Sequence, residues 1–301
     1  MRRLFLLLVS ICCLSFIVFF SLRLVPGDPV HLVVSPFAPK ELRDQVRERL
    51  GLDKPVYVQY LIFLRNAFQG DLGRSIKTGD SVLQEIGKRA PATLQLGLTA
   101  LIISYVIALP LGIISAMKPE SFVGIGAMMV GVIGISVPAF WLGLLLIISF
   151  SVALKWFPVT GYKSIRHLVL PSITLAAEGT ALNLRMIRSS MLEVLRQDYI
   201  ATARSKGISE WAVILKHALR NAMAPIITLL GLRIGWLIGG AIIVEMVFAW
   251  PGIGRLLVNS ILDRDYPVAQ AVMILLISCV VLGNLAADLL YVLVDPRIKY
   301  E

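Results

Sequence analysis

Long apolar runs separated by shorter polar segments dominate the pattern of hydrophobic and polar positions along this chain. A helix that crosses a hydrocarbon layer of ~30 Å needs about 20 mostly apolar residues, because each residue advances it by about 1.5 Å. Three of the runs are uncharged, and three more contain isolated charges. The pattern therefore predicts an all-α membrane protein with six transmembrane helices, in the runs 4–22, 90–117, 121–154, 167–187, 222–247 and 266–294.

Two of these runs need a closer look. The run 121–154 is too short for two spans and a turn, so we expect one span with a kink near Pro138, where the ring removes a helical hydrogen bond. The first run is longer than the apolar core of a signal peptide, and residues 23–27 do not form a small-residue cleavage site. We therefore expect residues 1–22 to remain as the first transmembrane helix.

The distribution of Lys and Arg predicts the orientation. With the N-terminus in the cytoplasm, the cytoplasmic segments carry more basic residues than the two short outer loops, and loop 23–89 is long enough to be exempt from the rule. The prediction is N-in and C-in, with a long periplasmic loop at 23–89 and a five-helix core at 90–301. Within the loop, the patterns at 39–51 and 56–68 predict two short helices.

Composition supports the same class of protein. Hydrophobic residues make up 57% of the 301 residues and charged residues 16%, whereas a soluble domain carries about 25% charged residues, so an ordinary soluble enzyme is excluded. The net charge of +10 is explained by orientation in a bilayer. Cys12, Cys13 and Cys279 lack the spacing of metal ligands, so we predict no metal site.

The segment of about 188–221, between the fourth and fifth predicted spans, is the most informative part of the chain. Gly207 separates two amphipathic helices, and Ser209 is a candidate N-cap of the second. The spacing predicts that the second helix buries one apolar face, formed by Trp211, Ile214, Leu215, Ala218 and Leu219. The composition of this segment fits a membrane-surface helix pair and a protein-docking surface equally well.

Charges within predicted spans need a physical reason, because each costs roughly 2.5–3.5 kcal/mol at the bilayer centre. Glu178 and Arg233 are the deepest. A structural ion pair between neighbouring helices is the favoured explanation, and a polar lining of a substrate path is the alternative. Asn183 and Arg185 lie nearer the inner end, where we expect contact with water.

Residues 198–207 and 215–222 resemble the cytoplasmic "EAA" loop of ABC importer permeases, in particular the dipeptide/oligopeptide/nickel subfamily. Stretches 26–29, 50–55, 70–73, 134–138, 251–255, 264–267 and 295–297 are also similar to that subfamily. The general motif has Glu, Ile and Pro at positions 201, 217 and 220, and this chain has none of them. The resemblance implies a coupling helix that docks on an ATPase, with the candidate coupling residues Tyr199, Ala201, Thr202, Ala203, Gly207, His217, Leu219 and Arg220.

The resemblance also implies a function for the chain. The chain is expected to be a non-catalytic permease subunit in a bacterial inner membrane, without a cofactor, working with a second permease, two ATPase subunits that bind ATP and Mg²⁺, and an extracytoplasmic solute-binding protein. Small residues at 201 and 203 are expected to admit a partner backbone. Di- or oligopeptides are the first expectation for the substrate, with nickel, a metal chelate or glutathione as alternatives.

Two rival classes remain for comparison. An intramembrane serine protease would need a histidine base near Ser136, and none of the three histidines lies within a predicted span at that depth. A stand-alone channel or transporter is the second rival, and paired half-domains would favour it, but the sequence shows no internal repeat. The chain also lacks a phosphate-binding G-x-x-x-x-G-K-[ST] loop, so any ATP hydrolysis must take place on separate subunits.

Overall fold

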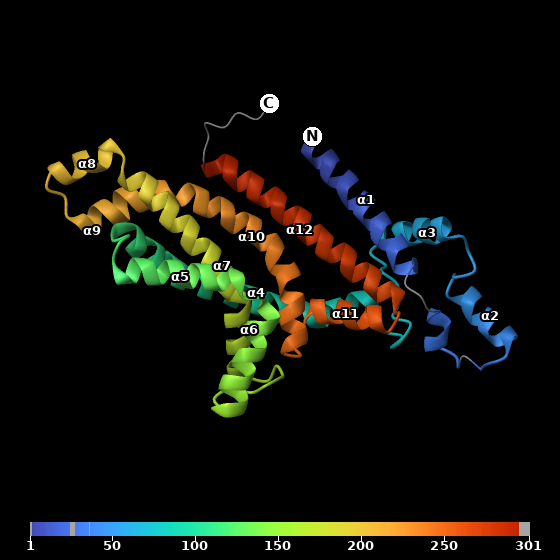
Figure 1. The fold of residues 1–301 in the computed structure, drawn as a ribbon. Helices are drawn as coiled ribbons and strands as arrows, with labels where there is room; N and C mark the ends of the chain where they lie inside the picture. The colour runs from blue at the N-terminus through green and yellow to red at the C-terminus, as the bar shows by residue number, and fades with distance from the viewer. Residues whose placement is uncertain (1, 25–27, 36, 295–301) are drawn as a thin grey trace. The chain divides into compact units, whose positions relative to one another are not determined.

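A computed structural model describes the backbone of residues 2–24, 28–35 and 37–294 (Figure 1). Side chains are described for the same residues except 2–8, 32, 224, 228–240 and 286–294. In these ranges the chain is helical, and its β-structure is limited to one isolated antiparallel bridge between Arg74 and Ser81. The all-α prediction is therefore confirmed for the described part of the chain.

The contacts divide the chain into two compact units. Unit 1 comprises residues 1–93 and 251–281, and unit 2 comprises residues 94–250 and 282–301. Two long helices contribute to both units, namely α4 (Val82–Met117) and α12 (Tyr266–Val294).

Unit 1 begins with α1 (Arg2–Leu24) and the short 3₁₀ helix η1 (Pro29–Leu32). It continues with α2 (Lys40–Arg49) and α3 (Val56–Phe68), which confirm the two short helices predicted at 39–51 and 56–68. Proline precedes both helices at the N-cap, and it pre-sets a backbone angle suited to a helix start. The last separate helix of this unit is α11 (Ile253–Leu262).

Aromatic side chains pack α1 against α3 in unit 1. The ring of Phe19 lies 5.1 Å from that of Tyr60 and 5.9 Å from that of Phe63, in tilted or edge-on geometries that aromatic pairs favour. The buried hydroxyl of Tyr60 is 2.9 Å from Ser15 Oγ, so its polar end is satisfied. Arg23 donates to Gln59 Oε1 at 2.9 and 3.1 Å, which fixes the end of α1 on α3.

Unit 2 is organised around α7 (Ile165–Leu195), which packs against α5 (Phe122–Ser136) and α10 (Leu219–Val247). The second part of α4 also approaches α7 closely. A Cβ built on Gly112 of α4 would lie 2.6 Å from Cγ2 of Ile187, so glycine permits this helix contact. The remaining elements are α6 (Ala139–Leu146), the π-helical segments η2 (Ile147–Ala153) and η3 (Val213–Ala218), α8 (Asp198–Ser205) and α9 (Glu210–Ala212).

The predicted kink near Pro138 is a sharp bend. Helix α5 ends at Ser136, Val137 is extended, and α6 starts directly after Pro138, so the two helical segments meet at 106°. The residue before a proline is pushed out of the helical region, which explains the break. Ser136 Oγ donates to the carbonyl of Val132 at 2.9 Å, one turn before it in α5, so the hydroxyl at the end of this helix is satisfied.

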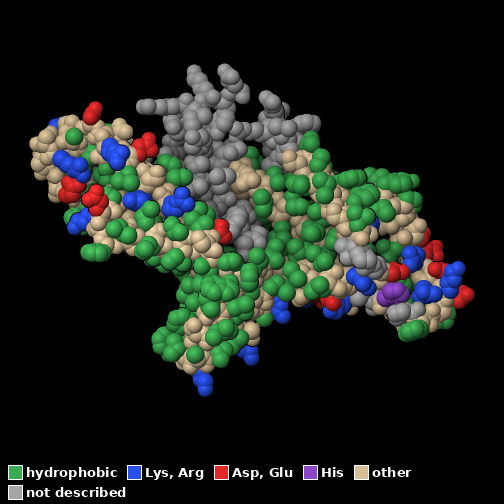
Figure 2. All heavy atoms as spheres, viewed as in Figure 1, with side chains coloured by type: hydrophobic (Ala, Val, Ile, Leu, Met, Phe, Trp, Pro, Cys, Tyr) green, Lys and Arg blue, Asp and Glu red, His purple; other side chains and the backbone are tan. Residues whose placement is uncertain are grey.

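Exposed apolar side chains mark the surfaces that would face lipid. Figure 2 shows hydrophobic side chains gathered over α6 and η2, where Phe140 and Trp141 are each 49% exposed and Ile148 is 58% exposed. Among the described residues, α4 and residues Tyr266–Leu285 of α12 are long and apolar enough to cross a membrane. The bent pair of α5 with α6 and η2 makes a third if it forms one span.

Candidate functional site

The segment that the sequence singled out forms a helical hairpin, which we call the 198–221 hairpin. Helix α8 follows α7 after a short break, and α9 with η3 runs directly into α10, as seen at one end of α7 and α10 in Figure 1. Gly207 lies between the two arms with φ of +75°, and its amide donates to the carbonyl of Arg204 at 3.0 Å. Glycine adopts this left-handed conformation without steric cost, so it closes α8 and reverses the chain.

One side of the hairpin is buried in the core of unit 2. Ile200, Val213, Ile214 and Ala218 are each 0% exposed, and they share one hydrophobic cluster with residues of α7. Burial of a large aliphatic side chain stabilises by roughly 1.5–3 kcal/mol. The hairpin is therefore held rigidly to the helices that precede and follow it.

The opposite side is exposed. The exposed members of the predicted coupling set are Tyr199, Ala201, Thr202, Gly207 and Arg220, while His217 and Leu219 are half-buried. Trp211 is 65% exposed and Leu215 is 53% exposed. These residues present a mixed apolar and polar surface.

Two sequence-based expectations about this hairpin are wrong. Ala203 is only 7% exposed and belongs to the hydrophobic cluster, so it does not face a partner together with Ala201. The reason is helical geometry, because residues two apart point about 200° apart around the axis. The predicted buried face fails at Trp211 and Leu215, since the wider π-helical turn of η3 shifts the phase and buries Val213 beside Ile214.

Polar contacts tie the two arms of the hairpin together. Arg204 donates to both carboxylate oxygens of Glu210, at 2.6 and 3.1 Å. The hydrogen bond from Arg204 lowers the pKa of Glu210 below its ordinary value, and the same bond raises the pKa of Arg204. Asn221 donates to Tyr199 Oη at 3.0 Å. We call the ion pair of Arg204 with Glu210 the clasp. The opposite charges on either side of Gly207 were its signal in the sequence, and the spacing of apolar positions does not reveal it.

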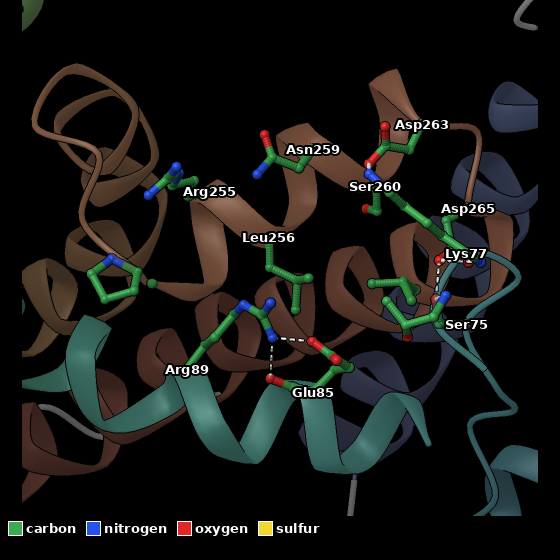
Figure 3. Close-up of a pocket in the computed structure, with 14 residues that line it drawn as sticks. Ser75, Lys77, Glu85, Arg89, Arg255, Leu256, Asn259, Ser260, Asp263 and Asp265 are labelled. Carbon is green, nitrogen blue, oxygen red and sulfur yellow. Dashed lines mark hydrogen bonds and ion pairs between the residues drawn. The ribbon is translucent and has the colours of Figure 1, made fainter. Parts of the chain in front are cut away.

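A second polar site lies in unit 1, which we call the α4–α11 pocket. This cavity of about 330 Å³ is bounded by the 75–78 turn, the first turns of α4 and the face of α11 (Figure 3). An ion pair joins Arg89 to Glu85, and Lys77 Nζ lies 2.6 Å from Asp263 Oδ2. Its lining is Ser75, Lys77, Thr78, Glu85, Arg89, Pro251, Gly252, Arg255, Leu256, Asn259, Ser260, Asp263, Asp265 and Val268.

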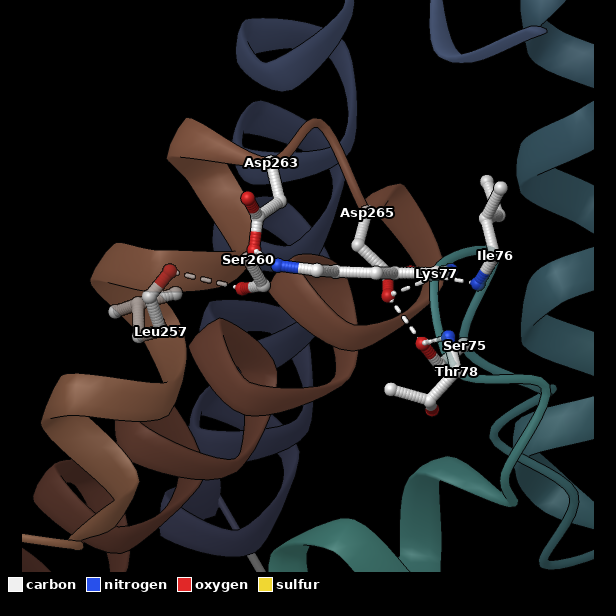
Figure 4. A network of polar contacts seen from close by, with 8 residues as sticks. All are labelled: Ser75, Ile76, Lys77, Thr78, Leu257, Ser260, Asp263 and Asp265. Carbon is white, nitrogen blue, oxygen red and sulfur yellow. Dashed lines mark hydrogen bonds and ion pairs between the residues drawn. The ribbon is translucent and has the colours of Figure 1, made fainter. Parts of the chain in front are cut away.

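Asp265 is the anchor of this pocket. Only 3% exposed, it accepts hydrogen bonds from Ser75 Oγ, from the amide of Ile76 at 3.0 Å and from the amide of Lys77 at 3.4 Å (Figure 4). A buried carboxylate is stable when such donors surround it. The segments around 70–73 and 264–267 stand out in the sequence, but nothing in the sequence indicates that residues so distant along the chain bond to each other.

The charged and polar residues predicted within spans do not all have the surroundings that the sequence predicted. Glu178 is half-buried on α7, while the side chain of Arg233 lies outside the described residues, so their pairing stays a prediction. Asn183 was expected to meet water but is 3% exposed and donates to Ser104 Oγ at 3.0 Å, because this side of α7 faces α4. Arg185 is exposed, as expected. Where side chains are described, no three His, Cys, Asp or Glu groups lie close enough to hold a metal ion.

Comparisons with known families cover nearly the whole chain. The family described as "Binding-protein-dependent transport system inner membrane component" matches residues 108–300. The family of the corresponding N-terminal segment of such membrane components matches residues 1–97.

Known relatives are similar over their full length. The glutathione transport system permease protein GsiC of Escherichia coli K12 is 44% identical over 300 residues, covering 100% of this chain and 98% of the relative. The oligopeptide transport system permease protein AppB of Bacillus subtilis 168 is 45% identical over 305 residues, covering 98% of this chain and 96% of the relative.

A solved structure shows the same fold. It is an inward-facing conformation of the MetNI methionine ABC transporter, which aligns with a TM-score of 0.60. The alignment covers 71% of this chain and 97% of the MetNI chain at 19% identity.

Proposed function

Since this chain belongs to the family of binding-protein-dependent transport system inner membrane components, we propose that it forms half of the translocation path of an importer for di- and oligopeptides. The chain is a permease subunit of an ABC importer. The observation that carries this conclusion is identity of 44–45% to such permeases over the full length of the chain. The MetNI fold agrees with it.

The proposed substrate is a small peptide. One relative is named for oligopeptides and another for glutathione, which is itself peptide-like, so both substrates share amide groups and carboxylates. Glutathione is therefore the second candidate. The decisive measurement is the ligand that copurifies with the partner solute-binding protein, identified by mass spectrometry. A metal ion or chelate in that protein, with no peptide, would refute the proposal.

For the membrane topology we propose six spans, with both termini in the cytoplasm of a bacterial cell. The spans correspond to α1, α4, the bent pair of α5 and α6, α7, α10 and α12. The distribution of basic residues supports this orientation. It puts the 198–221 hairpin in the cytoplasm and α2 with α3 outside. Cysteine accessibility at residues on the hairpin and on α2, probed from each side of the membrane, tests the assignment.

The proposed mechanism uses the 198–221 hairpin as a lever. ATP and Mg²⁺ bind to two separate ATPase subunits, and their closure pushes the exposed side of the hairpin. Because the buried side is packed into the core that contains α7, a push on the hairpin moves the membrane helices with it. A second permease subunit completes the path, and a solute-binding protein delivers the substrate from outside.

A matched pair of variants tests the coupling role. Ala201 is exposed, so Ala201→Trp should block ATPase docking and uptake while leaving thermal stability unchanged. Ala203 is buried, so Ala203→Leu should instead overpack the cluster and lower stability by about 1–3 kcal/mol. Uptake in proteoliposomes and copurification of the ATPase are the readouts. Normal ATP-coupled uptake by the Ala201→Trp transporter would refute the lever.

We further propose α2 as a landing site for the solute-binding protein. Helix α2 is a regular helix of ten residues, yet none of these residues is buried, and Leu42 is 43% exposed. An ion pair joins Arg47 of this helix to Asp28, but burial in a hydrophobic core does not explain why the polar helix is present. Deletion of residues 39–51 should weaken binding of the delivery protein and slow uptake. Unchanged binding in a surface-plasmon-resonance assay with the reconstituted transporter would contradict this role.

A further inference from the structure

A groove between α5 and α7 in unit 2 combines cationic and apolar side chains. We call it the α5–α7 groove, and its volume is about 570 Å³. Met128 lines it from α5, and α7 contributes Leu182, Arg185, Met186, Arg188, Ser189 and Leu192. From this lining we propose that the groove binds an anionic phospholipid, with the phosphate on the two arginines and an acyl chain along α5.

Among the described side chains, no carboxylate compensates the charge in the groove. No carboxylate lines the groove, and within the described side chains neither Arg185 nor Arg188 forms an ion pair. The Nε–H of Arg188 is buried without a hydrogen-bond partner, and its Nη1 contacts the Sδ atom of Met128, a weak acceptor. Guanidinium groups bind phosphate oxygens in pairs and with good geometry, so a phosphate would supply the missing acceptors.

The apolar part of the groove continues along α5. Ile125 and Val132 lie about one turn on either side of Met128, so the three share one face of the helix. They are 49%, 56% and 37% exposed, respectively. This stripe matches a hydrocarbon chain that extends from the phosphate into the bilayer.

The position of the groove fits a lipid of the inner leaflet. Arg185 and Arg188 lie in the last three turns of α7, at the inner end of the fourth predicted span. Basic residues at the cytoplasmic face attract anionic headgroups. The choice of leaflet rests on the proposed topology, but lipid binding itself can be measured without it. A free peptide would match the two cations through its carboxylate and leave the apolar stripe uncovered.

Native mass spectrometry of the assembled transporter tests the proposal. The complex is taken from nanodiscs of phosphatidylcholine with or without phosphatidylglycerol, and retained phosphatidylglycerol is counted. Each basic residue near a membrane surface contributes a factor of about 5 in affinity, so the double variant Arg185→Gln with Arg188→Gln should retain phosphatidylglycerol about 30-fold more weakly. Arg196→Gln is the matched control, because Arg196 is exposed beyond the end of α7 and outside the groove.

The outcomes separate the possible occupants. Loss of phosphatidylglycerol in the double variant, but not in the control, supports the proposal, provided that both unfold at the wild-type temperature. Equal retention by all three proteins, or full displacement by inorganic phosphate, overturns it. A photo-crosslinker at exposed Ser189 should capture lipid, and capture of peptide or of a second permease instead would also overturn it. Peptide uptake measured in parallel keeps failure of this site distinct from failure of the transport assignment.

Discussion

Replacement of Gly207 is the most direct perturbation of the 198–221 hairpin. With φ of +75° and no heavy atom within 4 Å of a built Cβ, the position is open in space but strained for a side chain. A left-handed residue other than glycine costs roughly 1–2 kcal/mol, more for a β-branched side chain, whereas Asn tolerates the conformation. Gly207→Val should therefore open the hairpin, and Gly207→Asn should preserve it.

The size of the effect on hairpin opening can be measured at two hydrogen bonds in the last turn of α8. The amide of Lys206 donates to Thr202 at 3.2 Å and that of Gly207 to Arg204 at 3.0 Å, so both bonds break when the reversal opens. A cost of about 2 kcal/mol raises the open population about 30-fold. Hydrogen exchange of these amides should accelerate by that order in Gly207→Val. ATP-coupled uptake should fall with it.

Gly87→Ala is the control for the substitution itself. Gly87 is exposed within α4 with nothing within 4 Å of a built Cβ and no positive φ. Alanine in a helix interior is favoured over glycine by about 0.5–1 kcal/mol, so this variant should be neutral or slightly stabilising. If Gly207→Val exchanged and transported like the wild type, the steric argument for the reversal would be refuted.

Three further predictions concern packing and charge. Asp265→Asn should destabilise the protein by about 1–3 kcal/mol in thermal unfolding, because it places an amide donor against backbone donors. The control Asp263→Asn, in an exposed ion pair, should cost less than about 1 kcal/mol. Equal effects of the two substitutions would refute the role of Asp265 as an anchor. Gly112→Ala should lower stability by about 1–3 kcal/mol, because the new methyl group clashes with α7. Gly126→Ala should not lower it, because the space around Gly126 is open. A neutral Gly112→Ala would contradict the close approach of α4 to α7. The lowered pKa of Glu210 means that its ion pair with Arg204 stabilises the hairpin above the ordinary Glu pKa, and that this stabilisation is lost as pH falls through the lowered value. Protection of the hairpin amides, measured relative to their intrinsic exchange rates, should therefore fall in acid, and Glu210→Gln should abolish that dependence. An unchanged pH profile in the variant would argue against the ion pair.

Local signals placed much of the secondary structure in advance. Proline at the start of α2 and α3, proline at the α5–α6 bend and glycine in the 198–221 hairpin each restrict the backbone of their own segment. Such restrictions act over a few residues, so they can be recognised without knowledge of the rest of the fold. The apolar runs likewise predicted long helices, because the length of a membrane span is set by the thickness of the bilayer and not by the segments packed beside it.

The tertiary structure decided which side of each element faces inward. Trp211 and Leu215 are exposed, contrary to the spacing, because the phase of this arm depends on the π-helical turn of η3. The bonds from the 75–77 turn to Asp265 and the pairing of Asn183 with Ser104 join residues far apart along the chain. Apolar periodicity specifies that a helix has a buried side, but the partner that covers it is fixed only when distant segments pack together.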